Sequence, residues 1–366
     1  MVIVQGEHVM GDSTVIRARV KALAVCVAAV GIFAAHGVQA QGLGGVVTFL
    51  DEAGTLIMPF DNTTNHASFQ IVTRVGPGTG GSGPVATHWS YWSEDCRHLV
   101  DVIVCLTPLD TKVMDPTAVQ GEVQSPNPPS NNNVGSITDL TGERGLVTVT
   151  AFEADTGPSG LECNIIDPES FLLTEIFGGW IIADTSSNAA FGADAIGLPP
   201  DALPEPSVFI VDGGVLVPTF NPQSLGASTV ITIGLEVPAG NGAFTDSEPG
   251  PINRDQADGN HVCCNVSFTD NLEISTSLPD LCFECVDFRA ISGAQAAAGE
   301  ASIIPPNTTI DSPGFATISN CTTAVEEGGP NGPLGDEFEQ FVFAIHGQAV
   351  GPFGVALHGT YTSDLL

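Results

Sequence analysis

Cysteines are the residues of this sequence whose types and spacing most clearly suggest chemistry. Four of the nine fall within HVCCNVSFTDNLEISTSLPDLCFECVDF (residues 261–288). A zinc ribbon takes its thiolates from two C-x2-C pairs, but here only Cys282 and Cys285 have that spacing, since Cys263 and Cys264 are adjacent. A redox C-x2-C pair would need a thioredoxin-like βαβ context, which the sequence lacks. The spacing therefore favours structural disulfides over metal binding.

Strand geometry limits how these cysteines pair. Neighbouring residues of a strand point to opposite faces, so Cys263 and Cys264 are expected to bond to different partners, with Cys282 and Cys285 nearest. The segment between Cys96 and Cys105 reads as one strand, roughly 30 Å long, whereas a disulfide needs Cα atoms within about 7 Å. These two are therefore not expected to bond to each other, so Cys163 and Cys321 become candidate partners, and the connectivity is otherwise open. The candidate disulfide cysteines are Cys96, Cys105, Cys163, Cys263, Cys264, Cys282, Cys285 and Cys321.

The densest aromatic cluster lies in THWSYW (residues 87–92). Alternation along a strand puts Trp89 and Tyr91 on one face and His88 and Trp92 on the other. Such rings either fill a core or stack on sugar rings at the surface of a β-sandwich. Both interpretations are open, so Trp89, Tyr91 and Trp92 are candidate ligand-binding aromatics.

Acidic residues are abundant, but no pair of them stands out as catalytic. The chain has no G-x-S-x-G, H-E-x-x-H or Walker motif, so no catalytic residue is predicted. The loop DQADGN places Asp255, Asp258 and Asn260 together, but their spacing departs from that of a calcium-binding loop. We expect no cofactor, with calcium at this loop as the alternative.

The N-terminus has the three parts of a signal peptide. Arg17, Arg19 and Lys21 precede the apolar run ALAVCVAAVGIFAA (residues 22–35), and small residues lead to a cleavage site after Ala40. The run is shorter than the ~20 residues that span a bilayer. We predict that residues 1–40 are removed and that the protein is secreted or held in the periplasm or cell envelope. Loss of Cys26 leaves an even number of cysteines, as expected for disulfides in an oxidising compartment.

The mature chain is strongly acidic. Removing the leader leaves 6 Lys and Arg (9 − 3) and 40 Asp and Glu (42 − 2), a net charge of −34. Such a surface repels nucleic acid and anionic lipid, because almost nothing can neutralise a phosphate. The expected partners are cell-surface proteins or glycans, with no nucleic acid and no membrane span in the mature chain.

The elements that must position these residues are short strands. Runs such as ASFQIVTRV, HLVDVIVCL and STVITIGLEV recur between clusters of Gly, Pro, Asn and Asp, and no sustained helical stripe is found. The pattern predicts an all-β protein of one or more β-sandwich units, immunoglobulin-like or jelly-roll-like, braced by disulfides, with little helix apart from the signal peptide. The Pro-rich loop SPNPPSNNN (residues 125–133) suggests two domains, 41–150 and 151–366.

The runs NTTNHASF, CRHLVDVIVCLTPLDT and SLPDLCFECVDF resemble segments of exported β-rich bacterial proteins of uncharacterised activity. The resemblance covers about a quarter of the chain; it implies export and an all-β fold, and no activity. We therefore expect a structural or adhesive role at or outside the cell surface, without catalysis. A carbohydrate-binding module is the first alternative, and a hydrolase with dispersed carboxylates is the second.

Overall fold

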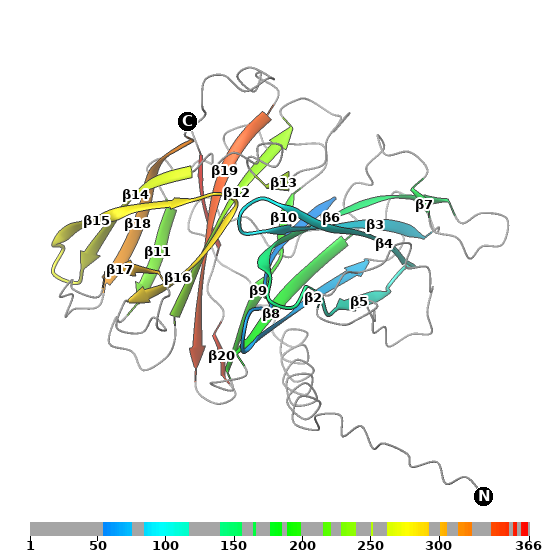
Figure 1. Cartoon of the computed structure of the whole chain (residues 1–366), viewed down its shortest axis with the longest axis horizontal. Coiled ribbons are helices and arrows are strands. Elements are labelled where there is room, and N and C mark those ends of the chain that lie inside the picture. Colours follow the sequence, from blue (N-terminus) through cyan, green and yellow to red (C-terminus); the bar gives the residue numbers. More distant parts are fainter. Residues whose placement is uncertain are drawn as a thin grey trace, which may run out of the picture.

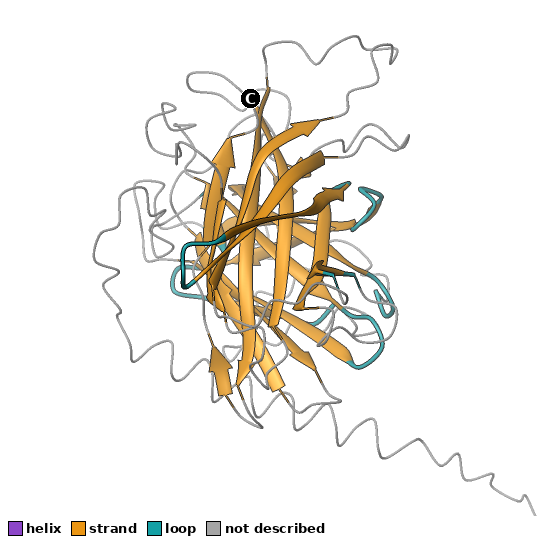
Figure 2. Cartoon of the chain, turned by 90° about the vertical axis from the view of Figure 1, so that its left-hand side faces the viewer, coloured by secondary structure: helices purple, strands orange, loops and turns teal. Residues whose placement is uncertain are grey.

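The computed structural model describes a set of strands and the turns between them. Its described residues are 54–74, 84–116, 140–155, 164–165, 176–184, 189–198, 215–220, 228–238, 250–251, 262–292, 301–305, 314–323, 338–350, 354–356 and 360–364. Every regular element in these ranges is a strand, and the strands form four sheets that are almost entirely antiparallel (Figures 1 and 2). The predicted all-β class is confirmed.

The first two sheets contain the N-terminal strands. The first sheet has the order β10-β1-β6-β3-β4, with β7 paired to β6, and the second has the order β5-β2-β8-β9. The first consists of β1 (Thr55–Asp61), β3 (Val85–Ser93), β4 (His98–Leu106), β6 (Arg144–Asp155), β7 (Asn164–Ile165) and β10 (Ile196–Leu198). The second consists of β2 (His66–Arg74), β5 (Thr111–Met114), β8 (Ile176–Asp184) and β9 (Ala189–Asp194).

The third and fourth sheets contain the later strands. The third has the order β17-β16-β12-β19-β20, with β13 beside β12 and β21 beside β19, and the fourth has the order β11-β18-β14-β15. The third consists of β12 (Ser228–Pro238), β13 (Gly250–Pro251), β16 (Val286–Ser292), β17 (Ser302–Ile304), β19 (Phe338–Val350), β20 (Gly354–Ala356) and β21 (Thr360–Asp364). The fourth consists of β11 (Val215–Phe220), β14 (Val262–Asp270), β15 (Ser275–Phe283) and β18 (Gly314–Thr323).

A tight turn takes the chain from the first sheet to the second. The Asp61 carboxylate accepts hydrogen bonds from the backbone N–H and the hydroxyl of Thr63, at 2.9 and 2.6 Å. The Asn62 side chain accepts one from the Ser68 N–H at 3.0 Å, and Asn65 takes a positive φ of 70°, which Asn tolerates better than most residues. The run DNTTN thus encodes the corner that lets β1 and β2 lie in different sheets.

The first and second sheets pack face to face as a β-sandwich. One cluster of buried side chains joins Trp89 and Val102 of the first sheet to Val72 and Trp180 of the second. The same cluster continues into the third sheet through the buried side chains Ile231, Ile233, Val286 and Phe288. Figure 1 shows this third sheet between the N-terminal strands on the right and the fourth sheet on the left. The three sheets therefore share one core.

Sheet membership changes along the chain between β10, which ends at Leu198, and β11, which begins at Val215. Residue 150, where the domain boundary is predicted, lies within β6, and β8 pairs with β2 along its whole length. The Pro-rich loop that suggested the boundary lies outside the described residues. The alternation of residues along a strand cannot reveal where sheet membership changes, since it does not say which strands pair.

The second sheet holds a buried ion pair. Lys112 Nζ lies 3.7 Å from Asp110 Oδ2, and both side chains are at most 5% exposed. Lys112 is the one lysine that remains after residue 40. The surface charge of the protein is therefore set by carboxylates and a few arginines.

Candidate functional site

Polar side chains from β3 and β4 meet on one face of the first sheet. The register places Ser90 opposite Asp101 and His88 opposite Ile103. A register shift between Tyr91 and Trp92 then brings His98 opposite Trp92. We call the four residues His88, Ser90, His98 and Asp101 the Asp101 cluster.

A single carboxylate oxygen organises the Asp101 cluster. Asp101 Oδ1 lies 2.6 Å from Ser90 Oγ, which donates to it, and 2.8 Å from His98 Nε2. His88 Nε2 lies 3.4 Å from the same oxygen. Ser90 Oγ is also 3.3 Å from His98 Nε2. The carboxylate is thus held between two imidazoles and a hydroxyl.

These contacts decide the charge state of Asp101. Partial burial would raise its pKa, but hydrogen bonds from His88, Ser90 and His98 outweigh burial and hold the pKa well below its ordinary value. The carboxylate is therefore ionised at neutral pH and in mild acid.

The cluster has the residue types of a serine hydrolase but not the hydrogen-bond pattern of its catalytic triad. In a catalytic triad the histidine accepts from the serine through one ring nitrogen and donates to the carboxylate through the other. Here His98 uses Nε2 for both contacts, and Ser90 donates directly to Asp101. No relay from serine to histidine to carboxylate exists in this arrangement. Among the described residues, no group of three His, Cys, Asp or Glu side chains is arranged to hold a metal ion.

The prediction of ligand-binding aromatic residues is wrong for two of the three candidates. Trp89 and Tyr91 are fully buried in the core; the Trp89 Nε1–H donates to Thr87 Oγ1 at 2.9 Å, and the Tyr91 ring packs edge-on against Phe60. They face the second sheet, so they cannot stack on a ligand. Trp92 is half-buried on the opposite face, with its ring 4.8 Å from that of His98. Of the three candidates, only Trp92 reaches the surface.

Six of the eight candidate cysteines are in disulfides. Cys263 bonds to Cys282, and Cys96 bonds to Cys285. Cys105 and Cys264 are also disulfide-bonded, and Cys163 and the side chain of Cys321 lie outside the described part of the chain. Cys263 and Cys264 have different partners, and Cys96 does not bond to Cys105, as strand geometry predicts.

The partner of Cys96 differs from the expectation. Sequence reasoning left Cys163 and Cys321 for it and offered Cys285 to the Cys263-Cys264 pair. In the structure the turn between β3 and β4 packs against the turn between β15 and β16, where the Cys285 N–H donates to the Glu94 carbonyl at 3.2 Å. Only this long-range packing brings Cys285 to Cys96.

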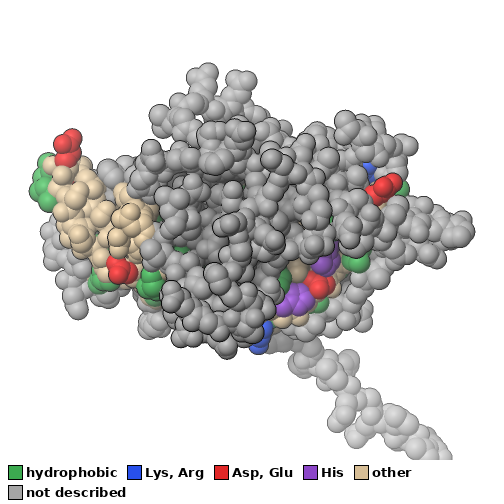
Figure 3. Space-filling view, turned by 90° about the horizontal axis from the view of Figure 1, so that it is seen from above, with side chains coloured by type: hydrophobic (Ala, Val, Ile, Leu, Met, Phe, Trp, Pro, Cys, Tyr) green, Lys and Arg blue, Asp and Glu red, His purple; other side chains and the backbone are tan. Residues whose placement is uncertain are grey.

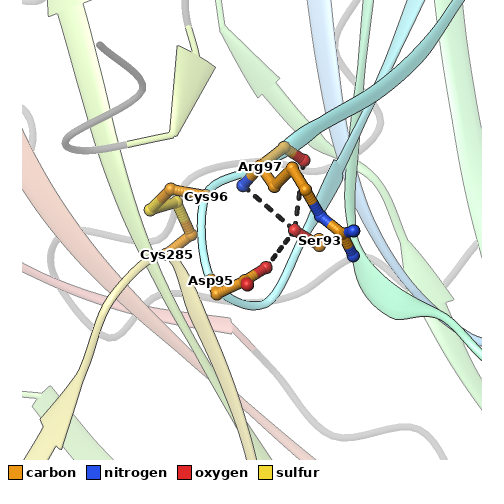
Figure 4. Close-up of a disulfide and its surroundings, with 5 residues drawn as sticks. All are labelled: Ser93, Asp95, Cys96, Arg97 and Cys285. Carbon is orange, nitrogen blue, oxygen red and sulfur yellow. Dashed lines mark hydrogen bonds between the residues drawn. A yellow bond between two sulfur atoms is a disulfide. The ribbon is translucent and has the colours of Figure 1, made fainter. Parts of the chain in front are cut away.

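Hydrogen bonds close the turn that carries Cys96 (Figure 4). The Ser93 hydroxyl donates to the Asp95 carboxylate and accepts from the Arg97 N–H at 3.0 Å. Cys96 takes a positive φ of 61°, an unfavourable conformation for this residue type. The surrounding hydrogen bonds and the disulfide hold it there.

Charged side chains surround the same junction. Arg144 pairs with Glu94 and places its guanidinium 5.5 Å from the centre of the Phe288 ring. Arg289 pairs with Asp287, whose pKa is raised by burial despite the pull of Arg289 and Arg144. Ion pairs therefore stabilise the junction in addition to the Cys96–Cys285 disulfide.

Several predicted features lie outside the described residues. They are the signal peptide, Cys163 and the calcium candidates Asp255, Asp258 and Asn260. In the part of the chain that the structure describes, no helix is long and apolar enough to cross a membrane.

Sequence reasoning missed the Asp101 cluster. The available signal was the alternation of His88, Ser90 and Trp92 along one predicted strand, next to a second strand holding His98 and Asp101. It could not be used without the register between the strands.

No family model, curated protein or solved structure matches this chain. Its class is therefore defined by its structure: an all-β protein of several antiparallel sheets with disulfide bonds, which indicate an oxidising environment.

Proposed function

We propose that this is an exported protein with a structural or adhesive role at or outside the cell surface. The leader sequence and the disulfides support export, because such bonds persist in oxidising compartments. The high negative charge keeps an apolar β protein dispersed.

One observation carries the structural role: Cys96–Cys285 links two regions of the chain that lie 189 residues apart. Cys96 lies at the end of the N-terminal sandwich, and Cys285 directly precedes β16 of the third sheet. The bond, the ion pairs around it and the shared core join these sheets into one braced body. Such a body resists local opening, which suits a protein exposed to the environment.

The β14–β15 hairpin supplies the adhesive contact in this proposal. Its turn exposes two large apolar side chains, Leu272 at 70% and Ile274 at 58%. Figure 3 shows hydrophobic and acidic side chains at this outer end of the molecule. The Asp270 carboxylate accepts from the N–H groups of Leu272 and Ile274, at 2.8 and 2.9 Å. The turn is thus fixed before binding, which lowers the entropic cost of contact with a cell-surface protein.

Export is tested by producing the full chain in a secreting host and analysing each fraction. We expect a mature N-terminus at Gln41 in the periplasm or medium, with thiols that react with an alkylating reagent only after reduction. An unprocessed cytosolic protein with free thiols would contradict the proposal.

Adhesion is tested by the double variant Leu272→Ser, Ile274→Ser. We expect its binding to whole cells to fall by about tenfold or more, since buried apolar side chains carry much of the energy of such contacts. Leu109→Ser is the matched control, because Leu109 is equally exposed, at 71%, in the turn between β4 and β5. An equal loss of cell binding in both variants would show that the β14–β15 hairpin is not the adhesive contact.

Glycan binding is the second candidate, favoured by Trp92. Its half-buried ring lies against that of His98, and His98 contacts the Asp101 carboxylate. An aromatic face beside a carboxylate is suited to a sugar ring and its hydroxyls. Glycan-array binding that disappears in Trp92→Ala and persists in Leu272→Ser, Ile274→Ser would favour this function over protein adhesion.

A further inference from the structure

The two fully described disulfides differ in exposure. Cys96 and Cys285 are buried, at 8% and 0%. Cys282 is exposed and Cys263 is half-buried. A reagent in solution can therefore approach one bond, whereas the other is enclosed by the junction around it.

The exposed bond lies at the border of a sheet. β15 is the last strand of the order β11-β18-β14-β15, and Cys282 on it is directly opposite Cys263 on β14. The two strands also pair through residues 266–269 and 275–278. Opening the bond therefore leaves the hairpin held by its remaining ladder, and exchange does not require unfolding.

Charged side chains near Cys282 determine which solutes can approach the disulfide. Asp280 is exposed two residues before it, and Glu284 is half-buried two residues after it. Arg289 Nη2 donates to the Cys282 carbonyl at 3.1 Å, but this guanidinium is also paired with Asp287. With a chain charge of −33, the surroundings repel anions.

We propose that Cys263–Cys282 is a site of thiol–disulfide exchange for small thiols that carry no negative charge other than that of the attacking thiolate. The sulfur of the incoming thiolate bonds to Cys282 Sγ as the Cys263–Cys282 bond breaks. Cys263 leaves as a thiolate and takes a proton from water. The incoming sulfur is oxidised and Cys263 is reduced, so the step needs no further oxidant.

The exchange stays confined to Cys263 and Cys282, which lie directly opposite each other. The freed Cys263 is adjacent to Cys264, which is in a disulfide of its own. Adjacent residues of a strand point to opposite faces, so the Cys263 thiolate is directed away from that bond. Shuffling within the chain is thereby disfavoured.

The order of opening tests the proposal. The native full chain is treated with 2-mercaptoethanol, quenched at intervals with N-ethylmaleimide, and analysed by peptide mass spectrometry. We expect Cys263 and Cys282 to react about 100-fold faster than Cys96 and Cys285, because access controls exchange. If Cys96–Cys285 opens as fast, or if both bonds open only at the rate of global unfolding, the proposal fails. The experiment uses the unmodified protein, so it does not depend on any variant folding.

The charge preference is tested with three thiols of similar size. When the exchange rate is divided by the concentration of thiolate, we expect cysteamine to react faster than 2-mercaptoethanol, and 2-mercaptoethanesulfonate to react slowest. The differences should shrink at about 1 M salt, where the Debye length is about 3 Å. Asp280→Asn should reduce the preference, whereas Glu153→Gln, which removes an exposed carboxylate of the first sheet, should not. Equal rates for the three thiols would overturn the proposed selectivity.

Discussion

Cys96 and Cys285 are separated by 189 residues, yet their Cα atoms lie 5.2 Å apart in a disulfide that joins the N-terminal sandwich to the third sheet. The closeness is reinforced by the contact between Cys285 and the Glu94 carbonyl and by the Arg144–Glu94 pair. A disulfide, a hydrogen bond and an ion pair therefore hold these two distant parts of the chain together.

Replacing both residues of this link should cost more stability than replacing those of the exposed one. The chain-entropy estimate is about 5 kcal/mol for the longer loop and about 3 kcal/mol for the shorter one, since Cys263 and Cys282 are separated by 19 residues. Denaturant unfolding of Cys96→Ser, Cys285→Ser and of Cys263→Ser, Cys282→Ser measures the difference. A larger loss in the second variant would contradict the bracing role.

Removing the Tyr91 hydroxyl should not harm the fold. Its oxygen is buried and makes no hydrogen bond among the described residues, so Tyr91→Phe removes a desolvated polar group. We expect the free energy of unfolding to stay equal or to rise by up to about 1 kcal/mol. Tyr91→Ala is the contrast, with a loss of about 3–5 kcal/mol from the cavity. A substantial loss in Tyr91→Phe would reveal a partner for the hydroxyl.

Tyr91 should also limit stability at high pH. Burial, with a smaller contribution from Asp115, raises its pKa far above the usual value. Because the unfolded state releases this proton near pH 10 and the folded state does not, stability should fall as pH rises above 10. Absorbance at 295 nm should show Tyr91 ionising only together with unfolding, and Tyr91→Phe should unfold at higher pH.

Asp101 should contribute stability that disappears in acid. Its folded pKa is lowered by hydrogen bonds from His88, Ser90 and His98. Its contribution is therefore complete above the unfolded pKa of about 3.9 and is lost as pH falls toward the folded pKa. Since the carboxylate is 45% exposed, the effect should be below about 1 kcal/mol.

Urea titrations of the wild type and Asp101→Asn check this behaviour between pH 2 and pH 7. The difference between the two proteins should be constant from about pH 5 upward and shrink below about pH 4. A difference that grows as the pH falls would mean that the carboxylate is not stabilised as an anion.

Lys112 should be hidden from reagents in the native state. Its ammonium is buried beside the Asp110 carboxylate, so an amine-reactive ester should modify the chain terminus and reach Lys112 only after unfolding. Lys112→Met should cost up to about 3–5 kcal/mol, because the buried Asp110 carboxylate loses the ammonium beside it. Rapid native labelling of Lys112 would contradict its burial.

Local sequence determined the secondary structure and part of the disulfide chemistry. The alternation in residues 85–92 assigned Trp89 and Tyr91 to one face and His88 and Trp92 to the other, as the structure shows. The length of the strand between Cys96 and Cys105 excluded a bond between them, because an extended backbone cannot bring its ends together.

Only the tertiary structure decided which faces meet and which cysteines pair. Period-two alternation distinguishes the two faces of a strand but does not say which is covered, so it left Trp89 and Tyr91 open as ligand-binding residues. The Asp101 cluster depends on the register between β3 and β4, and Cys96–Cys285 depends on two turns that pack against each other. These arrangements arise from contacts between distant segments, whose free energy no local pattern expresses.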